Sequence, residues 1–178
     1  MAGLPGLEGG QAIADVIFGD YNPGGKLPIT YPRYPNDLMT YDHKTSEISG
    51  LNRYNPQYAF GHGLSYTTFD YTKLHLSRKR LQENQTLQVR VTVSNRGAMA
   101  GKEPVLLFIR DLVRSVTPPV RQLKGFDSVF LEPGQSKTVE FVLSAADLSF
   151  IGREGSRMTE PGEFEIEVGG LKKRIILE

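Results

Sequence analysis

The chain has 178 residues, of which 39% are hydrophobic and 23% are charged, and its formal net charge is +1. This balance is ordinary for a globular domain and gives no reason to expect nucleic acid or an anionic membrane as a partner. No apolar run approaches the ~20 residues of a membrane span. The absence of cysteine excludes disulfides and thiolate metal sites.

Residues 1–32 predict one helix followed by one short strand. Ile13, Val16 and Ile17 recur at helical spacing, and Gly19 stands where a helix would end. "DYNPGG" has the composition of a turn, and "KLPITYP" predicts a strand whose proline places it at a sheet edge. One helix and one strand cannot bury each other, so this region needs a sheet that the chain does not supply. We therefore expect residues 1–32 to be poorly anchored and to favour self-association.

Residues 33–66 predict a connector. The first part is polar, contains prolines and has no periodicity, so we expect it to run extended over a surface. Within it, "YDHK" contains the two best candidates for contact with a ligand, Tyr41 and His43. The connector ends in "YAFGHGLSYTTF", which combines aromatic residues, glycines and hydroxyls just before the first clear strands.

Residues 67–178 predict an antiparallel β-sandwich. "TLQVRVTVSN" and "GEFEIEVGG" alternate apolar and polar residues, and "PVLLFIRD" suits a central strand. "QLKGFDSVFLEPGQSKTVEFVLS" predicts two strands around a Pro-Gly turn. With "FDYTKLHLS" and "LKKRIILE" the total is about seven strands, the number in an immunoglobulin or fibronectin type III sandwich. Because cysteine and tryptophan are both absent, the fibronectin-like variant is favoured.

The residues alone indicate no catalytic, cofactor or metal site. Glu8 begins the predicted helix, where the helix macrodipole favours a carboxylate. Glu163, Glu165 and Glu167 are interpreted as one solvated strand face without a balancing partner. The histidines are far apart and show no metal-type spacing: His43, His62 and His75.

Several stretches together resemble the family 3 glycoside hydrolases, the β-glucosidases and β-xylosidases. "GLEGGQAIADVIFGDYNPGGKLPITYP" resembles the end of that family's α/β sandwich domain, and "YAFGHGLSYTTFDY" resembles its Y-P-F-G-Y-G-L-S-Y-T-x-F signature. "MTYDHK" is similar to a Y-N-H-K stretch between them, and "PPVRQLKGFDSVFLEPGQSKTVEFVL" looks like the family's fibronectin type III-like domain. The chain departs from the pattern at Gly24, usually serine, at Ala59, usually proline, and at His62, usually tyrosine.

The resemblance implies three parts: residues 1–32 as a remnant of the α/β domain, residues 33–66 as a connector and packing segment, and residues 67–178 as the fibronectin type III-like domain. It implies a parent enzyme that hydrolyses O-glycosyl bonds with retention, through a nucleophile and an acid/base outside this chain. The missing barrel and α/β domains would be the partners, and family members are often secreted or periplasmic. The residues expected to pack between domains are Phe60, Gly61, Gly63, Leu64, Tyr66 and Phe69.

Two alternatives stay open on the sequence. A free-standing β-sandwich module that binds carbohydrate or protein would use surface aromatics, and the candidates are Tyr41, Tyr54 and Tyr58. An independent hydrolase would need paired carboxylates that the sequence does not reveal. Glycan binding would distinguish the first alternative, and turnover the second.

Overall fold

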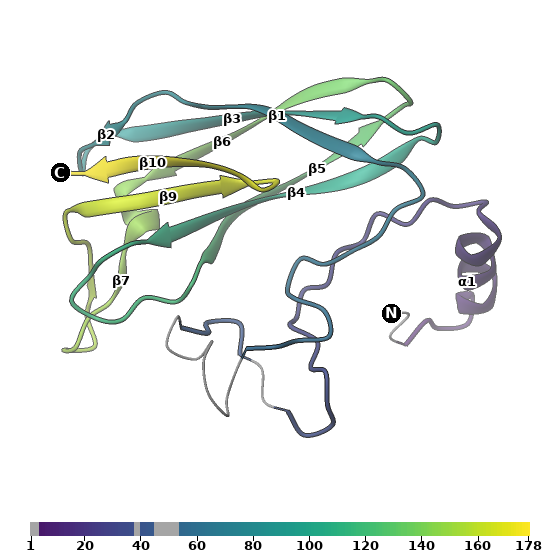
Figure 1. Cartoon of the computed structure of the whole chain (residues 1–178), viewed down its shortest axis with the longest axis horizontal. Coiled ribbons are helices and arrows are strands. Elements are labelled where there is room, and N and C mark those ends of the chain that lie inside the picture. The colour runs from purple at the N-terminus through teal and green to yellow at the C-terminus, as the bar shows by residue number, and fades with distance from the viewer. Residues whose placement is uncertain (1–3, 38–39, 45–53) are drawn as a thin grey trace.

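A computed structural model describes residues 4–37, 40–44 and 54–178, with a β-sandwich as its main body (Figure 1). One α-helix, α1 (Gly9–Phe18), stands apart from the sheets, at the opposite end of the molecule from the C-terminus. It ends as predicted, because Gly19 has a φ of 88°, the left-handed conformation that closes many helices. In the described part of the chain, no helix is long and apolar enough to cross a membrane.

Two sheets form the sandwich. The three-stranded sheet has the order β1 (Phe69–Leu76), β3 (Thr86–Asn95) and β6 (Ser136–Ser144). The five-stranded sheet has the order β2 (Arg80–Leu81), β10 (Leu171–Leu177), β9 (Gly162–Val168), β4 (Gly101–Asp111) and β5 (Gln122–Leu131). Its pairs are antiparallel except β2 with β10. The 3-10 helix η2 (Ala145–Leu148) and the small hairpin of β7 (Phe150–Ile151) and β8 (Arg157–Met158) follow β6.

The predicted fold class is confirmed. Seven of the described strands have seven or more residues, and they are the seven that the alternating stretches predict. The alternation has the expected cause, because one side chain of every two points between the sheets.

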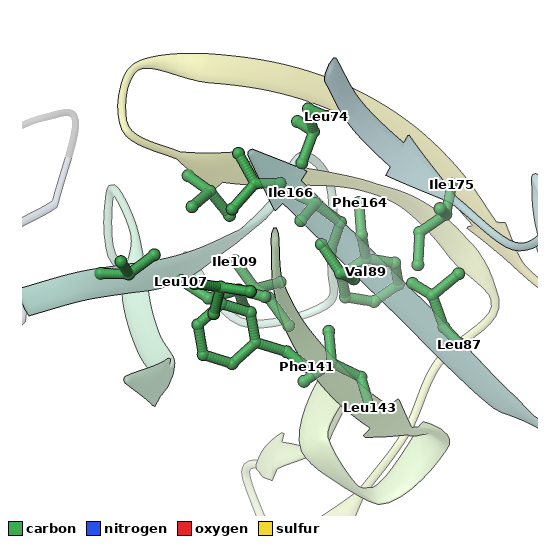
Figure 2. Packing of buried hydrophobic residues seen from close by; sticks show 14 of the residues in the cluster. Leu74, Leu87, Val89, Leu107, Ile109, Phe141, Leu143, Phe164, Ile166 and Ile175 are labelled. Carbon is green, nitrogen blue, oxygen red and sulfur yellow. The ribbon is translucent and has the colours of Figure 1, made fainter. Parts of the chain in front are cut away.

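The core lies between the two sheets (Figure 2). Val89 and Val91 of β3 lie opposite Phe141 and Val139 of β6 in the antiparallel register, and all four are buried. Ile166 contributes from β9 in the facing sheet. Each such side chain stabilises the fold by roughly 1.5–3 kcal/mol when it is fully buried, so this core anchors everything attached to the sandwich.

The strand expected in "KLPITYP" does not form. Residues 26–32 bend at Pro28 and Ile29, and their single β-bridge joins Tyr31 to Tyr58. Pro28 has no N–H to donate, so a continuous ladder cannot run through this stretch. The stretch nevertheless makes isolated backbone hydrogen bonds, described below, and these hold it in place.

Candidate functional site: the packing segment and the cavity beside it

Residues 58–69, called here the packing segment, run beside residues 27–31. The N–H of Gly61 donates to the carbonyl of Leu27 at 2.8 Å, and the N–H of Leu27 donates to the carbonyl of His62 at 2.8 Å. A third bond of 2.8 Å runs from the N–H of Tyr31 to the carbonyl of Tyr58. These bonds join the N-terminal region to the segment that leads into the sandwich.

Two glycines of the packing segment lie where a side chain would not fit. Gly61 has a φ of 82°, and a Cβ there would lie 3.0 Å from Cδ1 of Leu106 on β4. At Gly63 a Cβ would lie 2.4 Å from the carbonyl oxygen of Gly25. The segment therefore approaches the sandwich on one side and the N-terminal turn on the other more closely than other residues would allow.

The aromatic and aliphatic side chains of the packing segment divide between two directions. Phe60 meets Phe108 of β4 edge to face, with ring centroids 6.2 Å apart, and Phe69 packs against the sandwich core. Leu64 is 77% exposed, and Tyr66 is half exposed while its hydroxyl donates to the carbonyl of Val16 in α1 at 2.6 Å. The rings of Phe60 and Phe69 thus bind the segment to the sandwich, while Leu64 and half of Tyr66 remain exposed.

Asn22 links three separate parts of the chain. Its Nδ2 donates to the carbonyl of Ala100 at 2.8 Å, and its Oδ1 accepts from the hydroxyl of Ser65 and the N–H of Tyr66, both at 2.8 Å. The side chain is buried, so each bond replaces water that is absent there. Sequence reasoning treated Asn22 only as part of a turn, and its one local signal is its place before proline.

The turn after α1 is pressed against β4. A Cβ at Gly24 would lie only 2.2 Å from the backbone oxygen of Lys102, and one at Gly101 would lie 2.6 Å from Nδ2 of Asn22. Gly24 requires glycine in this arrangement, because the backbone of Lys102 cannot move aside, and a Cβ at Gly101 would displace the Asn22 amide from its hydrogen bonds. The N-terminal turn is therefore anchored, against the expectation for residues 1–32, although α1 itself leaves Ile17 and Phe18 exposed.

A buried carboxylate strengthens the same junction. Glu103 of β4 accepts from Nζ of Lys26 at 2.8 Å and from the hydroxyl of Tyr71 at 2.8 Å. Burial, reinforced by the charge of Glu103, raises the pKa of Tyr71 well above its usual range. The phenol thus stays neutral and serves as a donor to the carboxylate.

A cavity of about 240 Å³ lies between the connector and the five-stranded sheet. Its aromatic lining includes both predicted ligand contacts, Tyr41 and His43. The His43 ring stacks on Tyr54 at 3.5 Å with an interplanar angle of 5°, and the Tyr41 ring meets Phe60 at 4.9 Å. Burial raises the pKa of Tyr41, whose hydroxyl accepts from the N–H of Leu123.

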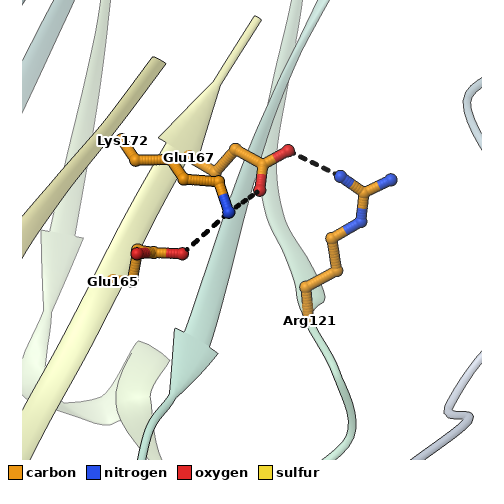
Figure 3. A network of polar contacts seen from close by, with 4 residues as sticks. All are labelled: Arg121, Glu165, Glu167 and Lys172. Carbon is orange, nitrogen blue, oxygen red and sulfur yellow. Dashed lines mark hydrogen bonds and ion pairs between the residues drawn. The ribbon is translucent and has the colours of Figure 1, made fainter. Parts of the chain in front are cut away.

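The polar side of this cavity comes from Thr30, Arg121 and Glu167. Arg121 stacks over the ring of Phe108 at 4.2 Å. It also donates to Glu167 at 2.6 Å, and Figure 3 shows this contact. The hydroxyl oxygen of Thr30 is buried and has no hydrogen-bond partner. Sequence reasoning missed all three residues, because they come from stretches far apart in the chain.

The glutamate row of β9 is balanced, so the interpretation of an unpartnered face was wrong. Lys172 of β10 lies 3.0 Å from Glu165 and 3.4 Å from Glu167, and Arg174 lies 3.5 Å from Glu163 (Figure 3 shows the first two contacts). The antiparallel register of β9 and β10 brings the two charged rows together. The pairing with Glu165 is the main reason that the pKa of Lys172 is raised.

The remaining titratable groups do not converge on a reactive centre in the described part of the chain. Glu8 precedes α1 and makes no side-chain cap bond. Asp111 and Lys124 line a void of about 10 Å³, and burial raises the pKa of the first and lowers that of the second. Such a void holds about one water molecule. Among the described residues, no group of three or more His, Asp or Glu could hold a metal ion.

Comparison with known families identifies both halves of this architecture. Residues 1–66 match the glycosyl hydrolase family 3 C-terminal domain, and residues 103–172 match the fibronectin type III-like domain. The chain matches the C-terminal portion of the family 3 glycoside hydrolases. The resemblance in the sequence motifs is thereby confirmed.

Relatives of this family 3 segment include named glycosidases. It is 41% identical to a lysosomal beta glucosidase of Dictyostelium discoideum, over 100% of this chain and 23% of the relative. It is 38% identical to a periplasmic beta-glucosidase of Salmonella typhimurium, over 92% of this chain and 23% of the relative. It is also 40% identical to a beta-xylosidase of Formosa agariphila, over 94% of this chain and 24% of the relative. The chain thus spans about a quarter of the length of these relatives.

Solved structures agree with the family 3 assignment. A β-glucosidase from Erythrobacter marinus superimposes with a TM-score of 0.87 at 38% identity, over 96% of this chain and 24% of that one. A beta-glucosidase from Listeria innocua in complex with glucose gives a TM-score of 0.88 at 31% identity, over 97% of this chain and 27% of that one. The arrangement of helix, packing segment and sandwich is therefore shared with much longer glycosidases.

Proposed function

We propose that this segment is the non-catalytic docking part of a larger retaining β-glucosidase-like enzyme. The observation that carries the proposal is the two-sided packing segment: Phe60 and Phe69 bind the sandwich, while Leu64 and Tyr66 face outward. A segment fixed on one side and apolar on the other is suited to hold a second body against the sandwich. The missing barrel and α/β domains are that body.

The same proposal assigns the three parts of the chain. Residues 1–32 belong to the α/β domain, residues 33–66 connect and pack, and residues 67–178 form the fibronectin type III-like domain. The exposed side chains of α1 support the first assignment, since Phe18 is 81% exposed and Ile17 is exposed beside it. In the parent, the α/β sheet would cover this face, and in the isolated chain the face favours self-association.

The proposal assigns the catalytic residues of the parent to its other domains. Retaining hydrolysis needs two carboxyl groups about 5–5.5 Å apart, one of them free to donate a proton to the leaving oxygen. Glu165 and Glu167 are near each other, but both accept from Lys172 on a strand face. Neither carboxyl group is therefore free to donate a proton to a leaving oxygen.

A chimera tests the docking role. In the Salmonella periplasmic beta-glucosidase, the region that matches this chain is replaced by residues 1–178, and hydrolysis of nitrophenyl β-glucoside is measured. We expect the chimera to be active, and we expect the chain alone and the truncated relative to be inactive. Leu64→Asp in the chimera should then lower kcat/KM at least tenfold, because a charge would be buried between the docked bodies.

The matched control is Val142→Asp, which places the same charge on an exposed apolar residue of β6, in the three-stranded sheet. It should leave the activity of the chimera within a factor of two. The proposal fails if Leu64→Asp is as harmless as Val142→Asp. It also fails if the isolated chain hydrolyses the substrate and Glu8→Gln abolishes that turnover.

A further inference from the structure

The cavity beside the packing segment has features that docking does not explain. We propose that it binds one neutral pyranose ring, at a site formed by the connector and the five-stranded sheet. Phe60 belongs to both proposals, but the inference can be tested apart from the docking role, because Thr30, Tyr54, Arg121 and Glu167 line the cavity and lie outside the packing segment.

The size of the cavity favours a single sugar unit. Its volume is about 240 Å³, far above the roughly 10–15 Å³ that one water molecule needs. It is slightly below the roughly 300 Å³ at which sites for drug-sized ligands begin. A monosaccharide therefore fits this space better than an oligosaccharide.

Aromatic rings supply the apolar wall that a sugar ring requires. Tyr41, Tyr54 and Phe60 all line the cavity. The stack of His43 on Tyr54 and the edge contact of Tyr41 with Phe60 fix these rings in place. The C–H face of a pyranose packs on such flat rings, and prearranged rings reduce the entropy lost on binding.

The buried hydroxyl of Thr30 is the second, independent sign of a ligand. The residue is only 9% exposed, and its Oγ1 has no hydrogen-bond partner although it lines the cavity. A buried hydroxyl without a partner is costly, so native proteins rarely keep one. A sugar hydroxyl placed in the cavity would satisfy it as donor or acceptor.

The charges of the cavity favour a neutral ligand. Arg121 and Glu167 lie 2.6 Å apart and neutralise each other, and Lys172 further compensates Glu167. An anionic or cationic ligand would have to compete with these pairs, whereas sugar hydroxyls can bond to both partners without separating them. A neutral polyol with one apolar face is thus the class of ligand that suits both the aromatic and the polar lining of the cavity.

Titration of the ¹⁵N-labelled chain with methyl β-D-glucopyranoside and methyl β-D-xylopyranoside tests the site. We expect saturable shifts, with millimolar dissociation constants, at the amides of Thr30, Tyr41 and Arg121. Sorbitol, which carries hydroxyls without a ring face, serves as the ligand control and should produce no saturable shifts there.

Three variants separate binding from folding. Thr30→Val keeps the shape of the side chain but removes the hydroxyl, and it should weaken binding roughly three- to tenfold without lowering the melting temperature. Tyr54→Ala should abolish the saturable shifts. Tyr34→Ala, which removes an exposed connector tyrosine outside the cavity, should leave binding unchanged.

The inference is overturned if neither glycoside produces saturable shifts. It is also overturned if the shifts persist in Tyr54→Ala, which would place binding elsewhere, or if sorbitol gives the same shifts. A Thr30→Val chain that melts lower and binds normally would assign the hydroxyl a structural role instead. None of these results bears on the chimera, so the docking role and the sugar site can fail separately.

Discussion

The sandwich and the N-terminal region are built from similar residues but reach stability in opposite ways. In the sandwich, alternating side chains of two sheets meet in one core, and the register of paired strands aligns even the charged rows. In residues 4–37, apolar side chains such as Phe18 and Ile17 point to solvent. The region is held in place by the side chains of Asn22 and Lys26 and by isolated backbone hydrogen bonds at Leu27 and Tyr31. The sandwich is thus stabilised by its own core, whereas residues 4–37 are attached to it by a few hydrogen bonds and an ion pair.

The largest expected effect separates the two regions directly. Leu107 of β4 has no exposed surface, so Leu107→Ala should lower the free energy of unfolding by ~2–5 kcal/mol through the cavity that it leaves. The same change at the exposed Leu64 should stay within about 0.5 kcal/mol. Urea denaturation followed by circular dichroism measures both. Equal losses at the two sites would contradict the division.

A smaller effect is expected where the attached region meets the sandwich. Asn22→Ala removes three hydrogen bonds and should release the N-terminal turn at a local cost of ~1–3 kcal/mol. Native-state hydrogen exchange should show faster exchange at the amides of Leu27 and Tyr66, while amides of β3 stay protected. If the whole chain is destabilised equally, the two regions form one cooperative unit instead.

The pH dependence of stability tests the contact of Tyr71 with Glu103, at the junction between the two regions. Its folded pKa is raised above 10.0, so its contribution is fully present below pH 10.0 and is lost as the pH rises through the folded pKa. Tyr71→Phe should cost ~1 kcal/mol at pH 7, because the bond to Glu103 is lost. It should also make the decline in stability above pH 10 less steep. Parallel alkaline declines in the two proteins would show that Tyr71 ionises as freely in the folded state as in the unfolded state.

The smallest effect concerns the charged rows of β9 and β10. Lys172 is 48% exposed and screened by solvent, so Lys172→Met should cost only about 0.2–1 kcal/mol at low salt. The loss should disappear in 1 M salt, where the Debye length falls to about 3 Å. Lys173→Met, at the neighbouring position, is the control. If the difference between the two variants survives high salt, packing rather than charge explains it.

The sequence predicted the strands, which show a repeating pattern of apolar side chains, and missed the contacts that depend on how the strands pair. Alternation in β3, β6 and β9 located the strands, because each strand alone records which of its faces is buried. The partners of the β9 glutamates were missed, since a partner on the next strand is known only once the register is known. The interpretation of "KLPITYP" as a strand failed because Pro28 breaks the ladder that the apolar pattern suggested.

The candidate site was predicted only in part for the same reason. Tyr41 and His43 were recognised as candidates from their aromatic and polar character in the connector. Thr30, Arg121 and Glu167 complete the cavity from three other stretches, and no local pattern marks them.

The close approach at Gly24 limits how members of this family can exchange parts. Where the family usually has serine, this chain has glycine, and its turn lies against the backbone of Lys102 at a depth that a Cβ would prevent. A family member with serine at this position must hold the turn further from the backbone of Lys102, or must arrange the stretch around Lys102 differently. Domain grafts should therefore move residues 19–26 and 97–104 together, because either stretch transferred alone would meet a surface shaped for a different partner.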